Sequence, residues 1–128
     1  MIIRRLIATL VALVVTGAAQ ALEVKPYANA TFKAAQAAGA PTVIHVHAPW
    51  CPTCKAQDAV LEKIKDKPAL KDVVVFRVDF DTQMDAVRTF KASSQSTLIA
   101  FKGKTETGRS VGATKSSAIE SLVLSATE

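Results

Sequence analysis

Hydrophobic and polar positions along the chain follow two periods, one typical of buried strands and one typical of amphipathic helices. Short apolar, β-branched runs predict strands, and apolar residues three and four positions apart predict helices. The pattern predicts strands at 22–24, 42–48, 73–80, 97–101 and 105–111, and helices at 28–38, 52–65, 82–91 and 116–124. This order, βαβαβαββα, predicts an α/β fold, and the strand at 42–48 is expected to be buried on both faces.

The first 21 residues differ from the rest of the chain. Two arginines precede an apolar run at 6–15, and residues 19–21 read Ala-Gln-Ala, the small-x-small pattern of a signal-peptidase site. We therefore predict that residues 1–21 are a cleaved secretory signal and that residues 22–128 form one domain. The apolar run is shorter than the roughly 20 residues of a membrane-spanning helix, so an uncleaved anchor is the lesser alternative. No stable membrane span is expected after cleavage.

Composition and charge change this picture only slightly. The 128 residues include 49% hydrophobic residues, which argues against disorder, and 16 Lys and Arg against 11 Asp and Glu, a formal charge of +5. Removal of residues 1–21 takes away two arginines and no acid, which leaves a charge of +3. An excess this small predicts no nucleic-acid partner, and we expect a monomer. In a bacterial host, export would place the protein in the periplasm, where thiols tend to oxidise.

The two cysteines, Cys51 and Cys54, lie where the predicted strand at 42–48 meets the predicted helix at 52–65. Two cysteines cannot complete a four-thiolate zinc ribbon or a disulfide-dense scaffold, so they must be explained as one pair. At the helix N-terminus, Cys51 faces unpaired N–H groups and the positive end of the helix dipole. This placement predicts an exposed thiol with a lowered pKa. Cys54, one turn further along, is expected to be sheltered.

A thiolate at Cys51 can attack a substrate disulfide, and Cys54 can then attack Cys51 to resolve the mixed disulfide. The reverse sequence oxidises a dithiol, so the pair is expected to cycle between a Cys51–Cys54 disulfide and two thiols. A Cys-x-x-Cys motif beside a βαβ pattern favours this redox interpretation. Two alternatives stay open: a binding module for a metal or an iron–sulfur cluster that uses the same dithiol, and an interaction protein with a non-catalytic disulfide.

Residues 48–55, which read Ala-Pro-Trp-Cys-Pro-Thr-Cys-Lys, resemble the active-site segment of the thioredoxin family. Residues 78–81 and 111–113 are similar too, so the resemblance covers essentially all of residues 22–128. It implies a central mixed sheet flanked by helices. It also implies thiol–disulfide oxidoreductase activity on protein thiols and disulfides, with no dissociable cofactor.

The resemblance also assigns roles by position. Cys51 would be the nucleophile, Cys54 the resolving cysteine, and Trp50 a flat aromatic rim that contacts substrate. A redox partner in the membrane or the periplasm would supply or accept the electrons. The sequence does not distinguish a reductant from an oxidant, and no residue is assigned as a metal ligand.

The loop before residue 97 departs from the family pattern. Thioredoxins carry a cis-proline just before the position of Thr97, and this chain has Ser96 there. We expect a trans peptide bond between Gln95 and Ser96, because a cis bond before a residue other than proline is costly. The loop then gains an N–H group and a hydroxyl near the sulfurs. The family contact with substrate backbone falls on Gln95, so Gln95, Ser96 and Thr97 are candidate substrate-binding residues.

The second departure is His45, which lies where many thioredoxins bury an acid beneath the second cysteine. A buried neutral imidazole there is a candidate base for the proton of Cys54. The alternative is a histidine that is simply hydrogen-bonded within the core. His47 is expected on the same face of the strand, because side chains two residues apart point to the same side.

Overall fold

The computed structural model describes residues 12–15, 17 and 20–128, and within these it confirms the predicted order of strands and helices. The strands are β1 (Glu23–Pro26), β2 (Pro41–His47), β3 (Val74–Asp79), β4 (Thr97–Lys102) and β5 (Thr105–Val111). The helices are α1 (Asn29–Ala37), α2 (Pro52–Ile64), α3 (Met84–Thr89) and α4 (Ser116–Ser125), with a short 3₁₀ turn, η1 (Pro68–Leu70).

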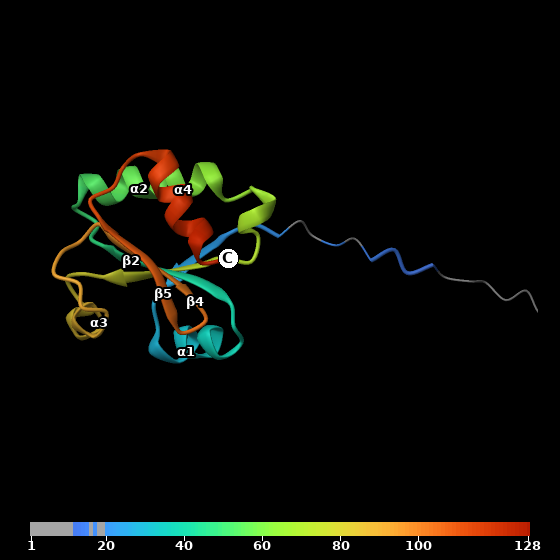
Figure 1. The fold of residues 1–128 in the computed structure, drawn as a ribbon, viewed down its shortest axis with the longest axis horizontal. Coiled ribbons are helices and arrows are strands. Elements are labelled where there is room, and N and C mark those ends of the chain that lie inside the picture. Colours follow the sequence, from blue (N-terminus) through green and yellow to red (C-terminus); the bar gives the residue numbers. More distant parts are fainter. Residues whose placement is uncertain (1–11, 16, 18–19) are drawn as a thin grey trace, which may run out of the picture.

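The strands form one mixed sheet in the order β1-β3-β2-β4-β5. Strands β1 and β2 run parallel to β3, whereas β4 runs antiparallel to both β2 and β5. Helices α2 and α4 cover one face of the sheet and α1 and α3 cover the other (Figure 1). Strand β2 is therefore central, and its residues from Thr42 to Val46 are buried, as the sequence predicts.

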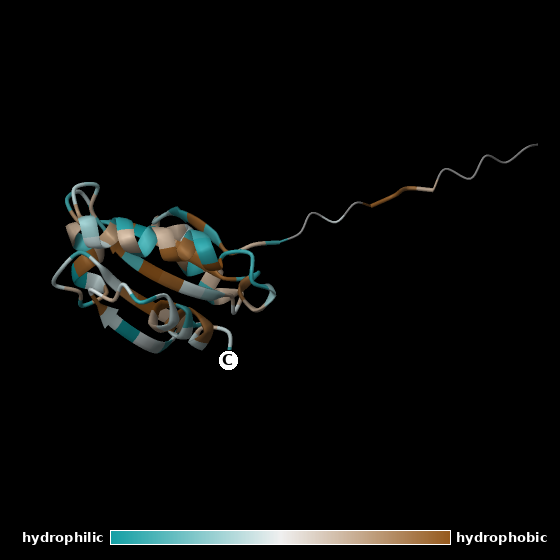
Figure 2. Cartoon of the chain, turned by 90° about the horizontal axis from the view of Figure 1, so that it is seen from above, coloured by the Kyte–Doolittle hydropathy of each residue, from teal (hydrophilic) through white to brown (hydrophobic). Residues whose placement is uncertain are grey.

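A separate hydrophobic core fills the space on each face of the sheet, and Figure 2 shows brown, apolar residues along both the strands and the helices. Beneath α2 and α4, residues such as Leu61, Ile64 and Ile119 pack on alternate positions of the strands. Beneath α1 and α3, the core is largely aromatic, with Phe32 packed edge-on against Phe76 at a centroid distance of 5.4 Å. The two cores hold β2, and with it the start of α2, from both sides.

Helix α3 begins at Met84 and not at residue 82, where the spacing of apolar residues predicts its start. The side chain of Asp79 explains the difference, because its Oδ1 accepts hydrogen bonds from the N–H groups of Asp81 (2.8 Å) and Thr82 (3.0 Å). This local turn occupies the start of the predicted helix, so the helix itself begins later.

Strand β1 is shifted relative to the predicted range of 22–24. It runs to Pro26, which is tolerated because β1 pairs only with β3 and lies at the edge of the sheet. Leu22 packs into the core instead, and its N–H donates to the carbonyl of Lys65 at 3.0 Å. Most of the predicted signal, residues 1–21, lies outside the described residues.

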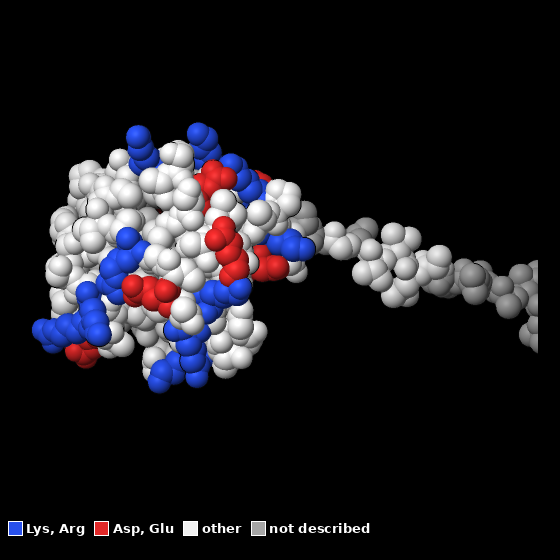
Figure 3. Space-filling model, viewed as in Figure 1, with Lys and Arg blue, Asp and Glu red and all other residues white. Residues whose placement is uncertain are grey.

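The surface agrees with the small net charge. Basic and acidic side chains lie interspersed on the face shown in Figure 3. Within the part of the chain that the structure describes, no helix is both long enough and apolar enough to cross a membrane.

Candidate active site

The cysteine motif lies at the start of α2, directly after the end of the central strand. Cys51 is the N-cap of the helix and Pro52 is its first residue, a position where the missing N–H of proline costs nothing. The Sγ of Cys51 accepts a hydrogen bond from the N–H of Cys54 at 3.1 Å. The predicted placement of this sulfur at a helix N-terminus is therefore confirmed.

The two sulfurs share one hydroxyl group. Ser96 Oγ lies 3.2 Å from Cys51 Sγ and 3.3 Å from Cys54 Sγ, and Cys54 Sγ lies 3.9 Å from the carbonyl oxygen of Val46. Both cysteines are free thiols, so the predicted Cys51–Cys54 disulfide is not formed and the structure shows the reduced pair. The hydroxyl expected near the sulfurs is present.

The environment divides the two thiols into a more acidic and a less acidic partner. Burial raises the pKa of Cys51, but hydrogen bonds from the Cys54 thiol, the Ser96 hydroxyl and the N–H groups of Cys54 and Thr53 outweigh it, so the pKa lies below its ordinary value. Burial, together with the hydrogen bond to Cys51, raises the pKa of Cys54. Cys51 is therefore the more acidic thiol of the pair, the one that loses its proton first.

The expectation of an exposed Cys51 is wrong. Its side chain is 2% exposed, and that of Cys54 is 0% exposed. Two side chains contribute to this burial: Ser96, itself 5% exposed, places its hydroxyl against both sulfurs, and Phe80 packs against the cluster that contains the two cysteines. The cover is local, since Trp50 and Pro52 on either side of Cys51 are exposed.

Trp50 lies on the surface beside the dithiol, as the sequence predicts. Its side chain is 56% exposed, and its Nε1–H donates to Oδ2 of Asp81 at 2.8 Å. That hydrogen bond connects the cysteine loop to the turn after β3 and fixes the ring in one orientation.

The turn that carries Ser96 has an unusual backbone. No cis peptide bond occurs in the described residues, so the bond before Ser96 is trans, and Ser96 has a φ of +65°. Its N–H donates to the carbonyl of Val46 at 2.8 Å, and its carbonyl accepts from the N–H of Gly112 at 2.9 Å. The N–H therefore bonds to the carbonyl that Cys54 Sγ also approaches, and is not available to bond to a sulfur.

The other two candidate substrate-binding residues differ in accessibility. Gln95 is half-buried at the surface of the turn. Thr97 is 1% exposed, and its hydroxyl donates to the carbonyl of Ser94 at 2.8 Å. Of the three candidates, Gln95 is therefore the one that a substrate can reach most directly.

His45 is fully buried beneath the motif and does not bond to either sulfur within the described region. Its Nε2 lies 2.8 Å from Oε1 of Gln57. Burial lowers the pKa of His45 to about 4, although the hydrogen bond to Gln57 and the charge of Asp58 act in the opposite direction. The imidazole is therefore neutral near pH 7, and its role as a base for Cys54 stays a prediction.

Gln57 is the site residue that the sequence pattern missed. The apolar spacing placed Ala56 on the buried face of α2, but Ala56 is exposed and Gln57 is 0% exposed. One signal was available: Gln57 follows Cys54 by three positions and precedes Leu61 by four, so all three lie on one helical face.

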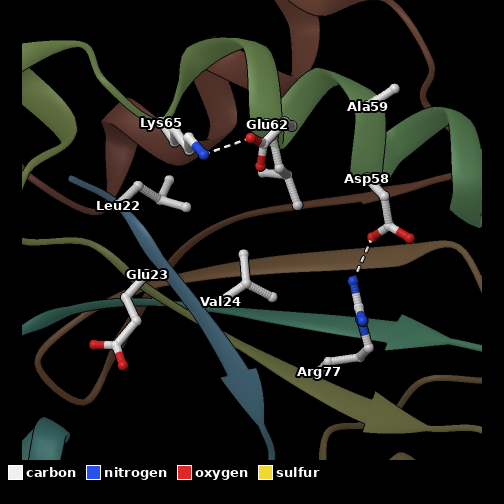
Figure 4. A pocket seen from close by; sticks show the side chains of 9 residues that line it. Leu22, Glu23, Val24, Asp58, Ala59, Glu62, Lys65 and Arg77 are labelled. Atoms are coloured by element: carbon white, nitrogen blue, oxygen red, sulfur yellow. Dashed lines mark hydrogen bonds and ion pairs between the residues drawn. The ribbon is translucent and has the colours of Figure 1, made fainter.

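Asp58 and Arg77 form a second polar group next to His45, which the sequence also did not indicate. Arg77 Nη2 on β3 reaches Asp58 Oδ1 on α2 at 2.7 Å, across a hollow between β1 and the helix (Figure 4). His47 Nε2 donates to Asp58 Oδ2 at 2.9 Å. The rings of His45 and His47 meet edge-on with centroids 5.4 Å apart, which confirms that they share a face.

These groups do not amount to a metal centre. In residues 12–15, 17 and 20–128, no group of three or more His, Cys, Asp or Glu side chains is arranged to hold a metal ion.

The fold and the dithiol can now be compared with known proteins. The family model described as Thioredoxin matches residues 23–125. The chain belongs to the thioredoxin family. The thioredoxin of Mycobacterium tuberculosis H37Rv is 38% identical over 73 residues, which cover 57% of this chain and 62% of that protein. This chain therefore spans less than two thirds of the length of that relative. A thioredoxin H-type of Brassica campestris is 31% identical over 87 residues, 68% of this chain and 69% of the relative.

Solved structures of thioredoxin-family proteins are also similar. Trxlp from Edwardsiella tarda EIB202 has a TM-score of 0.76 and 45% identity, covering 78% of this chain and 97% of that one. The Malassezia sympodialis thioredoxin has a TM-score of 0.70 and 26% identity, covering 84% and 95% of the two chains. These likenesses confirm the thioredoxin-like fold that the sequence predicts.

Acid is expected to destabilise this thioredoxin-family domain through His45. Between about pH 6.5 and about pH 4, the unfolded chain binds a proton at this imidazole and the folded protein does not, so the free energy of unfolding falls as the pH falls. The expected contribution is about 3 kcal/mol in total, and it does not grow below about pH 4, where both states are protonated. Urea unfolding at a series of pH values measures it.

Two variants isolate that contribution. His45→Leu should flatten the pH profile of stability relative to the wild type, even though it lowers stability near neutral pH by leaving Oε1 of Gln57 without a partner. His47→Gln changes the other histidine of the chain and should keep the wild-type slope. Parallel profiles for the wild type and His45→Leu would show that His45 does not carry the acid sensitivity.

Proposed function

We propose that this protein is a thiol–disulfide oxidoreductase that exchanges disulfides with protein substrates through Cys51 and Cys54. The observation that carries the proposal is the position of Cys51 Sγ, which caps α2, accepts a hydrogen bond from a backbone N–H and lies 3.2 Å from a hydroxyl that can donate to it. These donors stabilise a thiolate, the form of cysteine that attacks a disulfide. Membership of the thioredoxin family supports the same activity.

The proposed reaction consists of two exchanges. The thiolate of Cys51 attacks one sulfur of a substrate disulfide, the substrate S–S bond breaks, and a mixed disulfide forms while a substrate thiolate leaves. Cys54 then gives up its proton to solvent and attacks Cys51 Sγ, which leaves a Cys51–Cys54 disulfide and releases the second substrate sulfur as a thiolate that takes up a proton. Two electrons have passed from the protein to the substrate. The same steps in reverse oxidise a substrate dithiol.

Substrate access requires a small movement, because Cys51 is 2% exposed. Trp50 and Gln95 flank the buried sulfur and are the accessible candidates for substrate contact. We infer that a substrate docks on these two residues and displaces the Ser96 turn from the sulfur. Ser96 and Thr97 would then contact the substrate through the same loop.

We also propose that the protein is exported and acts in a periplasm, with residues 1–21 removed as a signal. Packing that begins at Leu22, which is 5% exposed, supports cleavage directly before this residue. N-terminal sequencing of protein taken from the periplasmic fraction of cells should begin at Leu22, and a sequence that begins at Met1 would contradict cleavage. A redox partner in the same compartment or membrane would set the direction of exchange.

Trapping of a mixed disulfide tests the proposed reaction directly. In Cys54→Ala, the first exchange can proceed but the resolving thiol is gone, so incubation with a disulfide-bonded test protein should give a covalent adduct that a reductant removes. Nonreducing electrophoresis and mass spectrometry detect the adduct. The matched control is the variant that also carries Cys51→Ala, which should give none. Absence of an adduct from Cys54→Ala would favour a dithiol with no catalytic role.

A further inference from the structure

One buried side chain, that of Gln57, joins three other parts of the site. Its Nε2 donates to the carbonyl of Ser96 at 3.0 Å and to the carbonyl of Ala113 at 2.9 Å, and its Oε1 contacts His45 Nε2 at 2.8 Å. These partners lie on β2, on the turn before β4 and on the loop before α4. A fully buried amide with all these bonds fixes the relative position of the segments it joins.

The chemistry of the partners leaves only one arrangement of this network. Carbonyl oxygens accept and cannot donate, so the amide nitrogen of Gln57 must face Ser96 and Ala113 and its oxygen must face His45. The oxygen in turn requires a hydrogen on Nε2 of His45. In the neutral ring, the remaining lone pair is then on Nδ1, which has no hydrogen-bond partner and lies 3.7 Å from Oδ1 of Asp58.

This arrangement directs His45 away from the proton chemistry of the thiols. The nitrogen on the side of the active site already carries its hydrogen and donates it to Gln57, and the nitrogen that can accept a proton faces Asp58. His47 and Arg77 also bond to Asp58, so the charged groups around His45 all lie on that far side. His45 therefore reaches the dithiol only through the amide of Gln57.

Ser96 is the part of the network that touches sulfur. Three hydrogen bonds to its backbone hold it at a φ of +65°: one from its N–H to Val46, and two to its carbonyl from Gly112 and Gln57. In this position its hydroxyl lies 3.2 and 3.3 Å from the two sulfurs. The Ser96 hydroxyl has one hydrogen and can donate it to only one sulfur at a time. A hydrogen bond to a thiolate is stronger than one to a neutral thiol, so the hydroxyl donates to whichever sulfur is ionised.

We propose that Gln57 is a positioning residue of the dithiol, which holds the Ser96 turn so that its hydroxyl stabilises the thiolate, with His45 as the anchor of the Gln57 amide. The inference rests on the proposed function, because the thiolate matters only if the protein exchanges disulfides. It assigns to His45 a role in orienting the amide, in place of the role of a base for Cys54.

A double-mutant cycle on the reduced protein tests the proposal. The thiolate of Cys51 is followed by its ultraviolet absorbance against pH in the wild type, Gln57→Met, Ser96→Ala and the double variant. Each single variant should lower the thiolate fraction at neutral pH by about tenfold or more, the effect of losing one hydrogen bond to a charged group. The double variant should fall no further than Ser96→Ala alone, because Gln57 acts through Ser96.

Thr42→Val is the control for loss of a buried polar group away from the site, since Thr42 lies on the face of β2 opposite to His45. Thr42 is 0% exposed and its hydroxyl has no hydrogen-bond partner in the described region, so this variant should keep the wild-type thiolate fraction. If Gln57→Met does not fold, Gln57→Glu serves as the second variant. It keeps the length of the side chain and the oxygen that faces His45, but it offers at most one donor to the two carbonyls.

Two results would overturn the proposal. In the first, Gln57→Met is less stable than the wild type but has the same thiolate fraction, which would make Gln57 a purely structural residue. In the second, the effects of Gln57→Met and Ser96→Ala add, which would mean that they act independently. Neither result depends on a substrate, so failure of the positioning role is distinguishable from failure of the proposed function, which the trapping of mixed disulfides decides.

Discussion

Replacing Cys51 by alanine is expected to remove the whole catalysed rate of disulfide exchange. The variant lacks the sulfur that attacks, and Cys54 cannot take over, because it is 0% exposed and burial raises its pKa. A thiol that keeps its proton is a poor nucleophile. The measurement is the rate at which a dithiol reductant reduces a disulfide-bonded test protein with and without the variant, and the two rates should be equal.

Lys55→Ala is the matched control for this prediction. Lys55 is exposed, directly follows the motif and makes no contact with either sulfur, so its removal should leave most of the rate in place. Turnover by Cys51→Ala above the rate of the reductant alone would contradict the assignment of the nucleophile. Equal loss in both variants would point to damage of α2 and not to the chemistry of one thiol.

The fold could be predicted from the sequence because local periodicity and tertiary packing agree at most positions. The β-branched run at 42–48 became β2, and the apolar residues Val60, Leu61 and Ile64 became the buried face of α2. The errors lie where a side chain forms a bond with the backbone. Asp79 delays the start of α3 by closing a turn, which depends on one hydrogen-bond geometry that no periodic pattern encodes.

The candidate site could be predicted only in part, for a related reason. The helix N-terminus, and the backbone N–H groups that help to lower the pKa of Cys51, follow from spacing along one segment. The burial of Cys51 does not, because part of its cover comes from Ser96, 45 positions away in the sequence. Gln57 was missed since polar residues on a helix are usually solvated, and only the positions of three distant partners show that this one is bonded in the core.

Replacement of Ser96 by proline, the residue that the thioredoxin family has before the position of Thr97, is expected to lower the free energy of unfolding by about 4 kcal/mol. Proline fixes φ near −65°, whereas Ser96 has a φ of +65°. Proline also lacks the N–H that donates to Val46 at 2.8 Å, which leaves that buried carbonyl without its main partner. Urea unfolding of the reduced protein measures the loss.

Ser96→Gly separates the backbone from the hydroxyl. Glycine adopts a positive φ freely and keeps the N–H, so this variant should stay within about 1 kcal/mol of the wild-type stability while it loses the hydroxyl that the two sulfurs share. Both variants should therefore have a smaller fraction of thiolate at Cys51, but only Ser96→Pro should also lose stability. A Ser96→Pro variant as stable as the wild type would contradict this prediction. It would mean that the turn can rebuild around a proline, and that the positive φ of Ser96 is not what holds the hydroxyl over the dithiol.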